Sequence, residues 1–225
     1  MNYKLYSFDK IPSTQTYAHE LIAGGNADDR MIILAAAQSA GRGRYRRKWI
    51  SHHGNLYASF VYKSDGRAPT LSYAVAVAVA ETLASFGIRP RIKWPNDILV
   101  DGKKISGILI EYSKNFVIIG IGVNIKSNPT VSDYETTKTD NYKKKITRDD
   151  FLEVLIEKMD LWLGRIRRGN FESVRAKWMG YATGLGAEIM YQGRPAVLCE
   201  INAEGALVLR RGSEYMLVHG DEISM

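Results

Sequence analysis

Short apolar runs bounded by turn residues dominate the first 125 residues of the chain. Residues 31–37 (MIILAAA) form a continuous apolar run without helical spacing, which predicts a buried strand. Residues 56–62 (LYASFVY) have the aromatic and β-branched composition of a second strand. Further strand patterns lie at residues 4–9, 91–94, 104–112 and 116–123. The pattern therefore predicts a sheet built from this part of the chain.

Helix signals occur in four segments, at residues 14–23, 70–86, 151–166 and 171–179. Ser13 or Thr14 can cap the first of them, and Gly87 ends the alanine-rich second one. Residues 126–146 are polar and carry a run of three lysines, so we expect them to form a surface excursion. We expect an α/β (α+β) protein with helices on one side of the sheet.

The sequence pattern of the chain changes after Gly184-Leu185-Gly186. Short β-type runs then alternate with glycine-containing turns, a rhythm typical of a small antiparallel barrel of about 40 residues. Such a small unit is marginal alone and is expected to pack on the main domain. The predicted organisation is a larger domain at residues 1–182 and a small β-barrel domain at 183–225.

Composition limits the compartment and the class of protein. The chain has 225 residues, is 45% hydrophobic and contains one cysteine, which excludes an internal disulfide. The N-terminus lacks the apolar segment of a signal peptide, and residues 73–80, the most apolar run, are too short to span a bilayer. We therefore expect a cytoplasmic protein that does not insert into membranes.

Positive charge is concentrated in one segment. The net charge is +7, and no Asp or Glu occurs between Met31 and Ser64, where six Lys and Arg residues lie. Residues 41–49 (GRGRYRRKW) hold five of them among glycines and aromatic residues. Glycine lets backbone N–H groups approach a ligand, and arginine donates to carboxylate or phosphate oxygens. The segment predicts a local anion site, because a protein that binds nucleic acid more often spreads its charge over a face.

Three other polar stretches stand at the ends of apolar elements, where binding groups are often found. They are residues 13–15 (STQ), residues 93–97 (KWPND) followed by the lysines and glycine of 103–107 (KKISG), and residues 120–124 (GIGVN). Each stretch alone has a simpler interpretation. Residues 13–15 can be a helix cap and residues 93–97 a turn, and residues 120–124 match a dinucleotide-binding fingerprint only weakly. His52 and His53 have no third ligand nearby in the sequence, so we expect no protein metal site there.

Together and in this order, these stretches resemble the biotin protein ligases. Gln38 with the GRGR–W segment, KWPND, the lysine and glycine of 104–107, and GIGVN carry the resemblance, which covers nearly the entire chain. It implies a mixed, largely antiparallel sheet followed by a small SH3-like barrel. It also implies two steps: biotin and ATP, with Mg²⁺, form biotinyl-5′-adenylate, and the acyl group then passes to a lysine of a biotin carboxyl carrier domain.

The resemblance assigns roles to fourteen residues. On the biotin side it implies Ser13, Thr14, Gln15, Gln38, Gly41, Arg42, Gly43, Arg44, Lys104 and Gly107. On the nucleotide side it implies Arg42, Arg44, Trp49, Asn96, Asp97 and Asn124. Lys104, Arg42 and Arg44 are the implied catalytic cations, which bring together two anions that repel each other.

This chain departs from the commonest family pattern in three ways. Gln15 stands where asparagine is common, and Tyr45-Arg46 stands where Arg-Gly is frequent. Ser13-Thr14 also begins so early that no N-terminal DNA-binding domain, and no specific DNA partner, is expected. Two alternatives stay open: a lipoate or octanoate ligase or transferase of similar fold, and an RNA-binding protein that uses the arginine–glycine loop. The sequence also leaves open whether the chain forms a homodimer.

Overall fold

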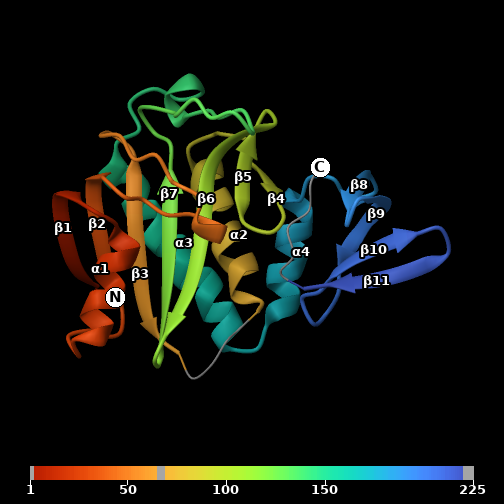
Figure 1. The fold of residues 1–225 in the computed structure, drawn as a ribbon, viewed down its shortest axis with the longest axis horizontal. Coiled ribbons are helices and arrows are strands. Elements are labelled where there is room, and N and C mark those ends of the chain that lie inside the picture. The colour runs from red at the N-terminus through yellow and green to blue at the C-terminus, as the bar shows by residue number, and fades with distance from the viewer. Residues whose placement is uncertain (1–2, 65–68, 220–225) are drawn as a thin grey trace.

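The computed structural model describes residues 3–64 and 69–219 and places the elements as Figure 1 shows. The strands are β1 (Lys4–Ile11), β2 (Met31–Gln38), β3 (Leu56–Lys63), β4 (Arg91–Lys93), β5 (Asp97–Val100), β6 (Lys103–Ser113), β7 (Phe116–Val123), β8 (Glu188–Tyr191), β9 (Arg194–Ile201), β10 (Leu207–Arg211) and β11 (Glu214–Val218). The helices are α1 (Thr14–Ala23), α2 (Leu71–Ser85), α3 (Arg148–Arg167) and α4 (Phe171–Tyr181), with short 3₁₀ turns η1 (Arg44–Arg46) and η2 (Thr139–Asn141). These bounds confirm the predicted strands of the first half and the four predicted helices.

Seven strands form the main sheet, in the order β1-β2-β3-β7-β6-β5-β4. Only β1 and β2 are parallel among the paired strands of this sheet, and the other neighbours are antiparallel. The prediction of a mixed, largely antiparallel sheet is thus confirmed. Strand β7 inserts between β3 and β6, so the glycines of GIGVN lie in the middle of the sheet.

Helices cover both faces of this sheet, and the expectation of helices on one side is wrong. Helices α2, α3 and α4 pack on one face against side chains such as Ile32 and Phe60. Helix α1 covers part of the other face, where Ile22 joins a second cluster with Met31 and Ile33. Neighbouring residues of β2 point to opposite faces, and nearly all of them are buried, so both faces need a cover.

Helix starts are fixed by side-chain caps. The hydroxyl of Ser13 accepts a hydrogen bond from the amide of Thr16 and so begins α1. Thr147 and Asp150 form a reciprocal capping box at the start of α3. Ser13 follows the carboxyl end of β1, and the next two residues, Thr14 and Gln15, contact Ser59 of β3 and Ile118 of β7, which places the start of α1 near the middle of one sheet face.

The C-terminal strands pair as an open four-stranded antiparallel sheet, in the order β11-β10-β9-β8. Among residues 183–219 no strand pairing closes this sheet into the expected SH3-like barrel. The unit packs on the main domain, since the hydroxyl of Tyr73 donates to the carbonyl of Gly205 at 2.8 Å and Leu198 joins the main core. The boundary between residues 182 and 183 stays a prediction.

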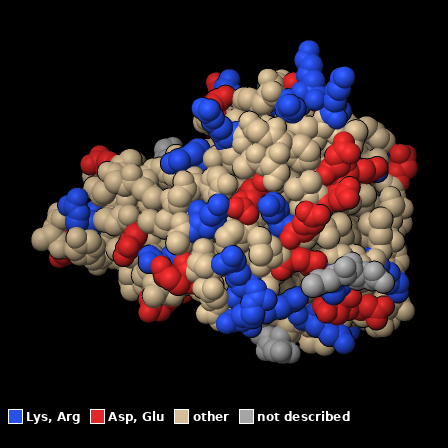
Figure 2. Space-filling view, turned by 180° about the vertical axis from the view of Figure 1, so that it is seen from behind, with Lys and Arg blue, Asp and Glu red and all other residues tan. Residues whose placement is uncertain are grey.

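Charges of both signs are interspersed on the face seen in Figure 2, where acidic and basic side chains lie side by side. This view is from behind Figure 1, so it looks at the face that α2 and α3 cover. Within the described residues, none of the helices combines the length and the apolar character needed to cross a membrane.

Candidate functional site

A pocket of about 480 Å³ opens on the sheet face that carries α1. Its walls come from β5, β6, β7, the start of α1, the basic loop after β2 and residues 133–135. Twelve of the fourteen residues that the sequence singles out line it: Ser13, Thr14, Gln15, Gln38, Arg42, Gly43, Arg44, Trp49, Asn96, Asp97, Lys104 and Gly107. Segments far apart in the sequence therefore meet at one place, as their order predicts.

One end of the pocket is a neutral hydrogen-bonding cluster. The side-chain oxygen of Gln38 accepts from the backbone amide of Thr14 at 2.8 Å and from its hydroxyl at 3.2 Å. The buried hydroxyl of Ser59 lies 2.9 Å from both the Thr14 hydroxyl and the Gln15 side-chain oxygen. Hydroxyl and amide groups can each donate and accept, so this end suits a neutral polar ring.

Gln15 lies flat against β7. A Cβ atom placed on Gly120 would lie 2.7 Å from the side-chain oxygen of Gln15, so the glycine makes room for the longer amide. The amide nitrogen of Gln15 donates to the carbonyl of Ile118 at 3.4 Å. The replacement of the common asparagine by glutamine is accommodated here by contacts within the sheet.

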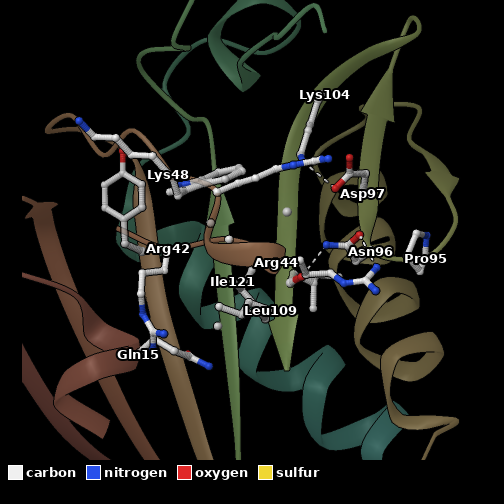
Figure 3. Close-up of a pocket in the computed structure, with 18 of the residues that line it drawn as sticks. Gln15, Arg42, Arg44, Lys48, Pro95, Asn96, Asp97, Lys104, Leu109 and Ile121 are labelled. Atoms are coloured by element: carbon white, nitrogen blue, oxygen red, sulfur yellow. Dashed lines mark hydrogen bonds and ion pairs between the residues drawn. The ribbon is translucent and has the colours of Figure 1, made fainter. Parts of the chain in front are cut away.

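The other end of the pocket is cationic. The ammonium of Lys104, near the start of β6, lies 2.7 Å from the carboxylate of Asp97, the first residue of β5. Arg44 reaches toward the same side, and its guanidinium lies 3.5 Å from the side-chain oxygen of Asn96. Figure 3 shows Lys104, Asp97 and Asn96 together on one side of the pocket, with Gln15 on the other. Six basic and three acidic side chains line the whole pocket, which favours a guest that carries negative charge.

Trp49 fills a slot made by two glycines. Cβ atoms on Gly107 and Gly122 would lie 2.8 Å and 2.5 Å from its indole ring, so only glycine fits at either position. The ammonium of Lys104 lies 5.5 Å from the ring of Trp49 and 4.8 Å from that of Tyr134. The aromatic groups thus flank the cation, which places an indole face beside the charged end of the pocket.

The basic loop crosses the pocket in a constrained backbone form. Within it, Tyr45 and Arg46 have φ angles of 53° and 60°, a left-handed region that costs non-glycine residues about 1 kcal/mol or more. Arg46 stands where glycine is frequent in the family pattern. The backbone of Arg46 keeps the left-handed conformation that glycine adopts easily, although the residue is an arginine. Arg42 lines the pocket while its guanidinium contacts Glu111 of β6 at 3.1 Å.

Gly41 and Asn124 are the two singled-out residues that the structure does not place in the pocket lining. Gly41 is buried beneath the loop, where a Cβ would lie 2.5 Å from the carbonyl oxygen of Trp49. The side-chain amide of Asn124 donates to the carbonyl of Thr137 at 3.0 Å and so ties β7 to the segment that covers Lys104. Their direct roles in binding stay predictions.

Several lining residues escape the sequence reasoning, notably Ser59, Gly120, Gly122, Tyr134 and Glu135. The two glycines belong to GIGVN. This motif was identified in the sequence, but the contacts of Gly120 with Gln15 and of Gly122 with Trp49 were not predicted. Ser59 is a polar residue in a buried strand, a signal that could have been read. Tyr134 had no signal, because the 126–146 excursion reaches the pocket through long-range contacts, such as the bridge between Lys104 and Thr136.

Comparison with known proteins decides the family. The family model described as "Biotin/lipoate A/B protein ligase family" matches residues 7–126, more than half of the chain. The chain belongs to this family. Among curated relatives in the family, the bifunctional ligase/repressor BirA of Bacillus subtilis is 31% identical over 100% of this chain and 75% of its own length. The biotin–[acetyl-CoA-carboxylase] ligase of Paracoccus denitrificans is 30% identical, covering 85% of this chain and 88% of its own.

Solved structures agree with the family assignment. The biotin protein ligase from Aquifex aeolicus, in complex with biotin and ATP, superposes with a TM-score of 0.88 and 25% identity. The match covers 98% of this chain and 97% of the Aquifex chain. The match includes the C-terminal sheet, so the whole described architecture is that of the family member.

Proposed function

We propose that this protein ligates biotin to a lysine of a biotin carboxyl carrier domain, using ATP and a biotinyl-5′-AMP intermediate. One observation carries the proposal: a single pocket joins a neutral hydrogen-bonding end to a cationic end that holds Lys104. Biotin has the matching shape, with a neutral ureido ring at one end and a carboxylate at the other. The likeness to a relative named as a biotin–[acetyl-CoA-carboxylase] ligase, and to a solved biotin protein ligase, supports the same proposal.

The reaction follows from this arrangement. The ring of biotin is held by Thr14, Gln38 and Ser59, and its carboxylate points to Lys104. A carboxylate oxygen attacks the α-phosphorus of ATP, the bond to pyrophosphate breaks, and biotinyl-5′-AMP forms. The Lys104 ammonium stabilises the negative charge shared by the two reacting anions, which would otherwise repel each other.

In the second step the amine of the carrier lysine attacks the acyl carbon, AMP leaves and the amine gives up a proton. Mg²⁺ enters this scheme with ATP, because magnesium keeps several waters and binds largely through phosphates. Within residues 3–64 and 69–219, no group of three or more His, Cys, Asp or Glu side chains is placed to hold a metal ion. We place the reaction in the cytoplasm.

The test uses the purified protein with biotin, α-labelled ATP and Mg²⁺. We expect a retained adenylate that forms only when biotin is present, and then transfer to a carrier domain that gains one biotinyl group. No binding of biotin in calorimetry, with or without nucleotide, would contradict the proposal. Lipoate and octanoate in the same assay separate the related ligases, which need an apolar tunnel in place of the Thr14–Gln38–Ser59 cluster.

The same purified protein tests the RNA-binding alternative. RNA bound by the arginine–glycine loop would lose affinity steeply as salt rises, whereas binding of a neutral ring would not. We favour the ligase, because the basic loop lies over a pocket whose lining includes three acidic side chains beside its six basic ones.

A further inference from the structure

Behind the wall of the pocket, Arg42 of the basic loop meets two charged or titratable side chains, Glu111 and His19, that none of the assigned motifs includes. Glu111 is on β6, and its carboxylate oxygen lies 3.1 Å from the guanidinium of Arg42 and 3.0 Å from the imidazole of His19 on α1. Arg42 lines the pocket, but Glu111 and His19 are not among the lining residues. Glu111 therefore contacts the loop arginine from its outer side and can act on a ligand only through Arg42.

The counter-charge for Arg42 has to come from outside its own segment. No Asp or Glu occurs between residues 31 and 64, and the loop holds four further cations that repel Arg42. Glu111 supplies the missing negative charge from the neighbouring sheet. Its side chain is 27% exposed and that of Arg42 is 39% exposed, so the pair is partly shielded from water and stronger than a fully exposed one.

The direction of Arg42 supports a role in shaping the pocket. Figure 3 places Arg42 on the side of Gln15, away from Lys104 and Asp97. Arg42 and Lys104 thus stand on opposite sides, each beside a carboxylate, Glu111 for Arg42 and Asp97 for Lys104. Without Glu111, repulsion within the loop would favour an arginine turned toward solvent.

We propose that Glu111 is a positioning residue for biotin binding, which holds the Arg42 guanidinium as part of the pocket wall. This inference rests on the proposed function. A purely structural tie between α1, β6 and the loop would change the unfolding temperature but not the affinity of the folded protein for biotin.

The first experiment measures biotin binding by calorimetry for the full chain and for Glu111→Gln, which keeps the shape and an acceptor but removes the charge. We expect Kd for biotin to rise on the order of tenfold, since a partly exposed charge-assisted hydrogen bond is lost. The unfolding temperature stays close to that of the unchanged protein. An unchanged Kd in a folded Glu111→Gln protein overturns the inference. The shorter Glu111→Asp, with an intermediate Kd expected, is the second variant.

A double-mutant cycle tests whether Glu111 acts through Arg42. In an Arg42→Met background, Glu111→Gln should change Kd no further, because the group it positions is gone. Losses that multiply in the double variant would overturn the inference. Glu172→Gln is the matched control, since Glu172 pairs with Arg175 at 2.9 Å on α4, away from the pocket, and it should bind biotin normally.

The two proposals fail in different ways. If the unchanged protein does not bind biotin, the proposed function fails and the Glu111 experiment has no starting point. If the unchanged protein binds biotin and Glu111→Gln binds it equally well, only the positioning role is wrong.

Discussion

The ammonium of Lys104 lies 2.7 Å from the carboxylate of Asp97, and both side chains line the same pocket. The pair is partly buried, with side-chain exposures of 14% and 25%. A cation in such a place is fixed in position before any substrate arrives, so little reorganisation is needed when negative charge develops beside it. Asp97 keeps the cation compensated while the pocket holds no anion.

Replacing Lys104 should therefore damage the chemistry and spare the fold. We expect Lys104→Ala to slow biotin-dependent adenylate formation on the order of a hundredfold or more, because one preorganised charge stabiliser is lost. The measurement is exchange of labelled pyrophosphate into ATP. Lys103→Ala is the control: this neighbour pairs with Glu135 at an exposed position and should exchange at the normal rate. Near-normal exchange by Lys104→Ala would remove Lys104 from the mechanism.

Gly122→Ala should displace Trp49. The added Cβ would lie 2.5 Å from one indole carbon and 2.6 Å from the indole nitrogen. Gly107, the partner of Gly122 on the neighbouring strand β6, lies under the other part of the same ring. Trp49 is the expected stacking partner of the adenine, so we expect KM for ATP to rise about tenfold, as the loss of one base–aromatic stack implies. Steady-state kinetics at saturating biotin measure this change.

Gly180→Ala is the control for this glycine substitution. A Cβ on Gly180 of α4 meets no atom within 4 Å, so the change should leave KM for ATP as it is and stabilise the helix by about 0.5–1 kcal/mol. An unaltered KM in Gly122→Ala would show that the position of the indole ring in this slot is irrelevant to ATP.

The fold was predictable where local pattern decides and not where distant segments meet. Residues 31–37 give a buried strand from their apolar run alone, and α3 follows from its capping box and amphipathic face. The insertion of β7 between β3 and β6 depends on long-range pairing, which no local pattern encodes. The presence of a helix on the second face of the sheet could have been inferred. The side chains of residues 31–37 are apolar without alternation, so they point to both faces of the sheet, and both faces then need cover.

The residues of the site likewise fall into those that sequence motifs predict and those that only the fold brings together. Lys104 and Asp97 stand in motifs whose residue types announce their chemistry, and the structure brings them together. Ser59, Tyr134 and Glu111 join the site or its outer wall through strand register and a returning loop. Glu111 in particular has an ordinary appearance in the sequence, an acid at the end of a strand, until the contact with Arg42 is known.

Glu81 should make the protein less stable in acid. Its carboxylate accepts from the indole N–H of Trp162 at 2.8 Å and pairs with Lys177 at 2.7 Å, so it joins α2 to α3 and α4. Burial alone would raise the pKa of Glu81, but the hydrogen bonds from Lys177 and Trp162 outweigh burial and lower this pKa below the usual 4.5. A lowered pKa in the folded state means stability that is present above pH 4.5 and lost as the pH falls through the folded value.

Glu81→Gln should accordingly lower the free energy of unfolding at neutral pH by about 1–3 kcal/mol, since charged hydrogen bonds are weakened. The difference from the unchanged protein should shrink as the pH falls from 4.5 through the lower pKa of folded Glu81, where its carboxylate becomes neutral. Urea unfolding at the two pH values measures it. Glu172→Gln, at an exposed pair, should cost much less at neutral pH. A difference that stays constant with pH would show that the charge of Glu81 does not stabilise the fold.

Substrates should protect the basic loop from trypsin. Residues 42–48 hold five cleavage sites, most of them exposed, and the loop crosses the pocket without belonging to either flanking strand. Binding of biotin and ATP adds contacts to this segment, so local opening becomes rarer and cleavage slows about tenfold. Mass spectrometry of the fragments gives the rate at each site. Arg167 and Arg168 are exposed at the end of α3 and in the turn that follows it, and they are an internal reference whose cleavage should not change. Equal protection of the basic loop and of the reference sites would indicate that the ligands stabilise the whole protein and not the loop in particular. If the loop is not protected at all, the prediction that it contacts the ligands is wrong.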